Sequence, residues 1–164
     1  MGKKNNNRGL QIIATLYIIG IISSFIIVSP GTIQITNDGV TVLGIIKTFC
    51  LNYWYIFIMW VLGLSIIGFI FNLFVIFFRG FVYGVLVIYL IRNNFTYFFA
   101  ITILDLILFL PLFFTMSYHS IITSYANYKK NHIKNDFYFK LMLISVVLIF
   151  IYSCLLEIIG GIYA

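Results

Sequence analysis

The stretch LFVIFFRGFVYGVLVIYLI, Leu73–Ile91, decides the fold of this chain. It holds 19 residues, and Arg79 is its only charged side chain. An α-helix rises about 1.5 Å per residue, so about 20 apolar residues cross the hydrocarbon core of a bilayer, which is ~30 Å thick. The stretch therefore predicts a transmembrane helix.

Four other stretches have the same apolar character: Leu10–Val28, Tyr53–Phe71, Phe95–Met116 and Leu141–Ile159. Of the 164 residues, 63% are hydrophobic and 9% are charged, whereas soluble domains carry roughly 25% charged residues. This composition excludes a soluble enzyme and a disordered chain. The sequence predicts an all-α, polytopic integral membrane protein in which residues 1–164 form one domain. That domain is a bundle of five transmembrane helices with interfacial helices.

The connections between the predicted spans differ in kind. Asn72 alone separates the second and third spans, which indicates either a tight hairpin of two crossings or a re-entrant pair. Pro111 is expected to kink the fourth span. Apolar residues recur at helical spacing in Val40–Leu51 and in Ser117–Asn127, and both segments predict helices lying on a membrane surface. The alternative for Ser117–Asn127 is a loop that rests on the headgroups.

Basic residues predict the orientation, because they are enriched in cytoplasmic connections. With five spans, seven of them fall on the side of the N-terminus: Lys3, Lys4, Arg8, Lys129, Lys130, Lys134 and Lys140. Only Lys47 and Arg92 fall on the opposite side. We therefore expect a cytoplasmic N-terminus and an extracytoplasmic C-terminus. Because the basic residues lie between apolar runs, they indicate the lipid bilayer as partner and no nucleic acid.

Three ionisable residues fall inside the predicted spans: Arg79, Asp105 and Glu157. A charge at the bilayer centre costs on the order of 2.5–3.5 kcal/mol on insertion scales, so each requires a physical reason. Arg79 and Asp105 can form an ion pair between the third and fourth spans. In the alternative arrangement, Arg79 extends to the cytoplasmic face, and Asp105 is protonated or bonded to a neighbouring hydroxyl.

No catalytic centre is evident in the sequence. The candidates for catalysis are Asp105, Glu157 and His119, since paired carboxylates can share a proton and histidine can transfer one. The two carboxylates fall at different depths, and neither lies in a glycine-flanked aspartate motif, which argues against a dyad. His119 and His132 have no cysteine or acidic residue at ligand spacing. We expect no metal site and no cofactor.

Small residues notch three of the spans and predict close helix packing within one bundle: Gly20 and Ser24, Gly63 and Gly68, and Gly80 and Gly84. The alternative is a homodimer face.

Two of these glycine-containing segments resemble the core motif of the stage II sporulation protein M family. They are WVLGLSIIG, Trp60–Gly68, and FRGF, Phe78–Phe81, followed by Gly84. The segment SCLLE, Ser153–Glu157, is similar to the end of the last span in that family. The resemblance covers Leu51 to Ile159 and implies these motif residues: Trp60, Gly63, Ser65, Gly68, Arg79, Gly80, Gly84 and Glu157.

The chain also departs from the family pattern. Many members have Pro-Gln-Asn ahead of the proline in the fourth span, where this chain has Leu104–Leu106. The segment between the first two spans is short, whereas sporulation members have a much longer one. The resemblance implies two settings: a scaffold for peptidoglycan hydrolases during engulfment, and the production of a circular bacteriocin. The short segment favours the second.

The sequence thus leads to the hypothesis of a non-enzymatic component of a peptide-handling complex in the plasma membrane of a Gram-positive bacterium. Its role would be maturation, export or self-immunity for a circular bacteriocin. The expected partners are a hydrophobic peptide and other membrane proteins, including an ABC-type ATPase or permease. The alternatives are the sporulation scaffold, an intramembrane protease or cyclase, and a small transporter subunit.

Overall fold

The computed structural model describes residues 3–28, 41–93, 95–129 and 136–163, and it is helical apart from the turn at Ser65–Ile67 and residues 28, 41 and 129 at the ends of these ranges. The elements are α1 (Lys3–Ile27), α2 (Val42–Leu64), α3 (Gly68–Asn93), α4 (Phe95–Leu104), the π-helical turn η1 (Asp105–Phe109), α5 (Leu110–Tyr128) and α6 (Asp136–Tyr163). Five segments of the described chain are long and apolar enough to cross a membrane, because α4, η1 and α5 together form one span of 34 residues. The predicted fold class is confirmed.

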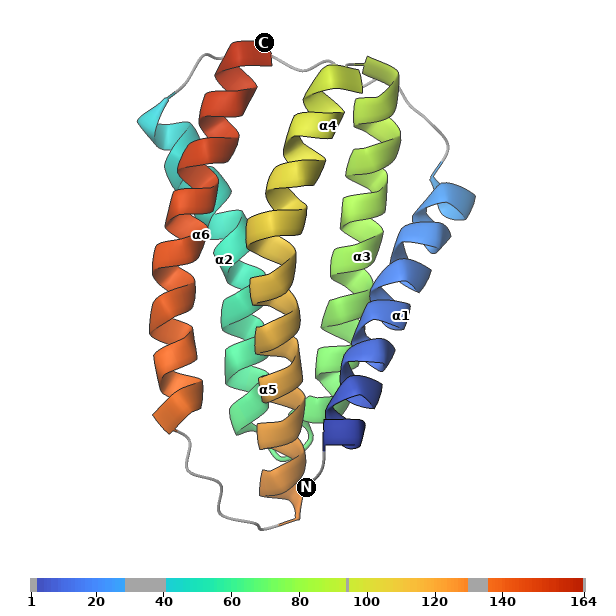
Figure 1. Ribbon diagram of the computed structural model, residues 1–164, viewed down its shortest axis with the longest axis vertical. Helices are drawn as coiled ribbons and strands as arrows, with labels where there is room; N and C mark the ends of the chain where they lie inside the picture. Colours follow the sequence, from blue (N-terminus) through green and yellow to red (C-terminus); the bar gives the residue numbers. More distant parts are fainter. Residues whose placement is uncertain (1–2, 29–40, 94, 130–135, 164) are drawn as a thin grey trace.

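The five spans run alternately up and down, so that the two ends of the chain lie at opposite ends of the bundle (Figure 1). Helix α1 lies at one side and packs mainly against α3. Helix α2 packs against α5 and α6, and α3 also contacts α5. The long fourth span therefore occupies the middle of the bundle.

The boundary predicted between the second and third spans is wrong. The turn lies at Ser65–Ile67, and the helices on either side contain 23 and 26 residues. Gly68 determines this position, because a Cβ there would collide with the backbone of Leu62. Asn72 lies within α3, fully buried, and its side-chain amide donates to Ser120 Oγ at 2.6 Å. Each helix is long enough to cross a bilayer, so the pair is not a short re-entrant loop.

Neither predicted surface helix exists as a separate element. Residues 42–51 are the first turns of α2, and Thr41 caps this helix by accepting a hydrogen bond from the Gly44 N–H at 3.0 Å. Residues 117–127 continue α5, and the small polar side chains of this stretch are buried: Ser117, Ser120, Thr123 and Ser124. Their hydroxyls make this face a packing surface, so the helix remains in the bundle and does not turn onto the membrane surface.

A π-helical turn, η1, lies directly before Pro111 in the fourth span. The Leu110 N–H bonds to the Asp105 carbonyl, five residues back, and Pro111 has no N–H to donate. The π-helical turn accommodates the missing donor. It also keeps Asp105 and Phe109 on the buried face of the span, in line with Phe113.

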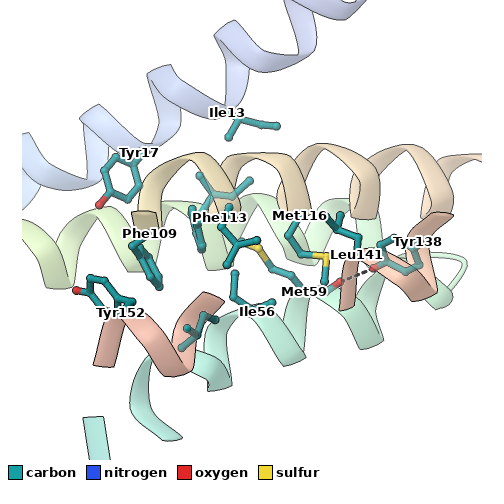
Figure 2. Packing of buried hydrophobic residues seen from close by; sticks show 13 residues of the cluster. Ile13, Tyr17, Ile56, Met59, Phe109, Phe113, Met116, Tyr138, Leu141 and Tyr152 are labelled. Carbon is teal, nitrogen blue, oxygen red and sulfur yellow. Dashed lines mark hydrogen bonds between the residues drawn. The ribbon is translucent and has the colours of Figure 1, made fainter. Parts of the chain in front are cut away.

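The hydrophobic core is formed by side chains of α1, α2, α3, η1, α5 and α6, which meet inside the bundle (Figure 2). Its best-buried members include Ile13, Ile56, Met59, Phe113 and Met116. Rings add to this packing, since Phe109 and Phe113 stack with their centroids 5.7 Å apart. The core thus joins α1 to the rest of the bundle.

Candidate functional site

The motif at the end of α2 forms a close junction with α5 and α6. Gly63 lies directly against Tyr138, and a Cβ at this position would also lie 2.8 Å from Ser120 Oγ. Trp60 stacks on the Tyr138 ring with a centroid distance of 6.3 Å. The Ser65 carbonyl accepts a hydrogen bond from Ser124 Oγ at 2.7 Å. The motif residues Trp60, Gly63 and Ser65 therefore pack against α5 and α6 inside the bundle.

The carbonyl groups near the end of α2 accept hydrogen bonds from other helices. The Tyr138 hydroxyl of α6 lies 3.2 Å from the Met59 carbonyl (Figure 2). It also lies 2.8 Å from the Trp60 carbonyl. Ser120 Oγ of α5 also donates to Met59 and accepts from Asn72. These contacts link α2, α3, α5 and α6 at the end of the bundle where α2 and α3 meet.

The second motif segment packs α3 against α1. Gly80 lies against the backbone of Tyr17, and a Cβ there would lie 3.0 Å from the Tyr17 carbonyl carbon. A Cβ at Gly84 would lie 2.9 Å from the Ile21 carbonyl oxygen. From the other side, Gly20 faces Gly80 and the backbone of Phe77. The glycines let the two helix backbones touch.

Arg79, which precedes Gly80, lines a cavity of 440 Å³ on the other side of α3. Residues of α2, α3, α4, η1 and α6 surround this cavity. It lies in the half of the bundle that contains the ends of α3 and α6, because the α3 residues after Arg79 and the α6 residues Tyr152 and Leu156 line it. Five tyrosines contribute to its wall: Tyr55, Tyr83, Tyr89, Tyr97 and Tyr152.

The Arg79 guanidinium is held inside the bundle. It donates from Nη2 to Asn52 Oδ1 at 3.1 Å, and its central carbon lies 5.0 Å from the Tyr55 ring centroid and 4.3 Å from that of Phe109. Both rings offer a face to the cation. Arg79 lies 11 residues after Gly68 and 14 before Asn93, near the middle of α3, and it is 8% exposed. Its charge therefore lies deep in the bundle.

Asp105 lines the same cavity and is 3% exposed. Its carboxylate accepts a hydrogen bond from the Tyr152 hydroxyl of α6. Among the described residues, Arg79 and Asp105 make no direct ion pair, although they are close enough to interact electrostatically. The sequence left open an ion pair and an arrangement in which Asp105 bonds to a neighbouring hydroxyl; in the structure Tyr152 supplies such a hydroxyl, and Asn52 accepts from the guanidinium.

The motif geometry agrees with a comparison of whole sequences. A model of the family described as stage II sporulation protein M matches residues 11–162. The chain belongs to the stage II sporulation protein M family. Neither a comparison with curated proteins nor one with solved structures finds a match. The match includes all the motif residues of this family member, from Trp60 to Glu157.

The remaining candidate residues of this stage II sporulation protein M family member lie apart. The Glu157 carboxylate lies against Gly44, in the first turn of α2. The positive end of the α2 dipole suits a carboxylate there. His119 lies on α5 towards the opposite end, where its ring centroid is 4.8 Å from that of Phe137. Within the described ranges, no three histidine, cysteine or acidic side chains cluster as metal ligands would. His132 lies outside the described residues.

The sequence pattern did not single out Asn52 and Tyr152 of the cavity. Asn52 adjoins the predicted start of the second span, where a polar residue is expected. Tyr152 lies in an aliphatic run, and a tyrosine in a span has no fixed partner. The sequence does indicate that polar neighbours must exist, because burying Arg79 and Asp105 in a membrane is costly. It does not identify which residues those neighbours are.

Proposed function

We propose that this protein is a non-enzymatic membrane component of a complex that handles a hydrophobic peptide, in the maturation, export or self-immunity of a circular bacteriocin. The observation that carries the proposal is the small size of the connection between α1 and α2. These helices end at Ile27 and begin at Val42, which leaves 14 residues, 28–41. Because domains below about 40 residues rarely fold without added cross-links, this connection is too short for an extracytoplasmic domain. The chain is thus a compact bundle that acts within the bilayer.

The separation of the three catalytic candidates supports a non-enzymatic role. Asp105 is bonded to Tyr152, Glu157 lies against Gly44, and His119 packs on a phenylalanine near the other end of the bundle. General acid–base catalysis requires such groups within hydrogen-bond reach of one substrate atom. These three positions do not converge on a common point.

The exterior of the bundle suits a hydrophobic helical partner. Large apolar side chains are exposed along the outer faces of the spans, among them Phe74, Phe99, Leu106 and Leu143, each more than half exposed. In a bilayer these faces meet lipid tails or another apolar helix. The peptide and an ABC-type ATPase or permease are the partners we propose for them.

We propose the plasma membrane of a Gram-positive bacterium as the location, with the N-terminus in the cytoplasm. Helix α1 begins at Lys3, α5 ends before Lys129, and α6 begins four residues before Lys140, all at the end of the bundle with the N-terminus (Figure 1). Lys47 and Arg92 lie towards the other end. This asymmetry supports the orientation through the preference of basic residues for the cytoplasmic side. Reporter fusions at each terminus test it.

The experiment expresses the chain together with the linear precursor and its partner genes, and measures mature cyclic peptide and the survival of the host. Deleting the gene for this chain is expected to lower the yield of mature cyclic peptide or the survival of the host. Alanine variants of Asp105, Glu157 and His119 are expected to retain mature peptide, with membrane levels of each variant measured in parallel. If one variant accumulates normally but produces only linear peptide, the protein is an enzyme and the proposal fails.

The family description names a sporulation protein, which supports the second candidate that the resemblance implies: a membrane scaffold that recruits peptidoglycan hydrolases during engulfment. This role predicts that the hydrolases co-purify with the chain and that engulfment stops in its absence. The compact connection between α1 and α2 distinguishes the two candidates physically, because a scaffold for extracytoplasmic enzymes needs surface on that side of the membrane.

A further inference from the structure

The cavity beside α3 holds a basic and an acidic side chain that make no direct contact with each other. Arg79 and Asp105 both line it, both are more than nine-tenths buried, and neither is the hydrogen-bond partner of the other. A guanidinium has five N–H donors. Among the described residues, Arg79 uses one of them, for Asn52, and its buried Nε has no acceptor. A buried charge that lacks partners is costly, so this arrangement favours a bound group that supplies them.

The surroundings of the two charges restrict what that group can be. A simple anion would meet Arg79 but would also face the Asp105 carboxylate. A simple cation would meet Asp105 and the tyrosine rings but would also face the guanidinium. A molecule that carries both charges satisfies each side, and the aromatic wall adds attraction for an ammonium. Leu51, Val82 and Leu86 complete the wall with apolar surface.

The guanidinium is held in place before any ligand binds. Asn52 holds Nη2, while Tyr55 and Phe109 lie within 5.0 Å of the central carbon of the group. Tyr152 fixes the carboxylate of Asp105 in the same way. Ligand binding therefore requires little ordering of these two side chains, which favours affinity. The cavity volume of 440 Å³ lies in the range of small-molecule sites, roughly 300–1,000 Å³.

We propose that this cavity binds a zwitterion with an apolar body, with its anionic oxygen group at Arg79 and its ammonium at Asp105 and the tyrosine rings. Two sources carry this chemistry: a free apolar α-amino acid and the headgroup of an ethanolamine phospholipid. The site is independent of the peptide-handling role, because it lies inside the bundle and requires no partner chain.

The test uses the full chain purified in detergent, with three probes of one shape. L-phenylalanine carries both charges, phenethylamine carries only the ammonium, and 3-phenylpropionate carries only the carboxylate. Equilibrium binding is expected for phenylalanine, at least tenfold tighter than for either analogue, since each analogue loses a charge-assisted contact.

In a second arm, native mass spectrometry compares the retention of phosphatidylethanolamine and phosphatidylglycerol by the delipidated protein. Binding of phenylalanine identifies a free zwitterion, and selective retention of phosphatidylethanolamine identifies the headgroup.

Variants locate the site. Arg79→Gln and Asp105→Asn are each expected to weaken binding tenfold or more, and the double variant removes both buried ionisable groups while keeping a polar amide at each position. The double variant therefore remains folded if burying the charges is costly, and its unfolding midpoint is measured alongside. The matched control is Asp136→Asn with Lys140→Gln, which removes two exposed charges of α6 outside the cavity. The proposal is overturned if neither zwitterion binds, if a singly charged analogue binds equally, or if the folded double variant binds like the wild type.

Discussion

Replacing Gly80 tests the contact between α1 and α3. A Cβ at this position would lie 3.0 and 3.2 Å from two backbone carbons of Tyr17 and still closer to its carbonyl oxygen. Backbone atoms cannot rotate away as a side chain can, so α1 must move by on the order of 1 Å to restore ordinary contact distances. Overpacking of this kind costs about 1–3 kcal/mol, whereas alanine gains up to about 1 kcal/mol over glycine in a helix.

We therefore expect Gly80→Ala to destabilise the bundle by about 1 kcal/mol and Gly80→Leu by about 2 kcal/mol or more. The control is Gly160→Ala in α6, where the nearest atom to a new Cβ is the Tyr97 hydroxyl oxygen at 3.3 Å. Because a tyrosine end can shift, this variant is expected to be neutral or to gain up to about 1 kcal/mol from helix propensity. The assay is reversible unfolding in mixed detergent micelles, followed by the helical circular dichroism signal.

Gly20 provides a second check, because it faces Gly80 from α1. Once one alanine has moved the two helices apart, a second alanine at the same contact causes less additional steric overlap. The destabilisation of the Gly20→Ala/Gly80→Ala double variant is therefore expected to be smaller than the sum for the two single variants. Strict additivity would show that the two glycines do not share a contact. A Gly80→Leu variant that unfolds like the wild type but changes from dimer to monomer would place the glycine face between two copies and refute the internal packing.

Three further predictions concern polar contacts, each measured by the same unfolding assay. Tyr138→Phe is expected to cost about 1 kcal/mol, because the carbonyls at 3.2 and 2.8 Å lose their donor. Ser120→Ala is expected to cost about 1–3 kcal/mol, since it leaves the buried amide of Asn72 without its acceptor. Gly44→Ala is expected to be destabilising because the new Cβ displaces the Glu157 carboxylate, and Glu157→Ala is expected to remove most of that cost.

Each of these three predictions has a control or a result that would contradict it. Tyr128→Phe removes a hydroxyl from an exposed ring and is expected to change stability by less than about 0.5 kcal/mol. A Tyr138→Phe variant as stable as this control would show that the hydroxyl bonds contribute nothing. For Ser120, unchanged unfolding with a retained helical signal would contradict the network with Asn72. For Gly44, an equal cost in the wild-type and Glu157→Ala backgrounds would rule out the steric explanation.

The sequence predicts the number and nature of the spans because apolar length is a direct consequence of bilayer thickness. It places their boundaries less well, and asparagine shows why. Asn72 lies inside α3 and Asn52 inside α2, although each was placed at or beside a span boundary. A single side-chain amide is tolerated within a long apolar helix when a residue of another helix forms a hydrogen bond with it. Ser120 does so for Asn72, and Arg79 does so for Asn52. Such partners are distant in sequence, so composition alone cannot reveal them.

The candidate site was predictable to a similar extent. Arg79 and Asp105 are visible as charges within apolar runs, and they do line one cavity. Their partners depend on the rotation of each helix, and the π-helical turn before Pro111 alters that rotation at Asp105. The segment Ser117–Asn127 illustrates the same difficulty, because apolar residues at helical spacing fit a membrane surface and a bundle face equally well until the neighbouring helices are known.

The hydroxyl contacts at the end of α2 have a consequence for the order of biogenesis. The Met59 and Trp60 carbonyls belong to the second span to leave the ribosome, whereas the Tyr138 hydroxyl that binds them belongs to the last. Throughout synthesis of α3, α4 and α5, that donor does not yet exist. A nascent chain that stops before α6 therefore carries an incomplete junction into the membrane, with the Met59 and Trp60 carbonyls lacking the Tyr138 donor. Completion of the final helix is the step that closes the bundle.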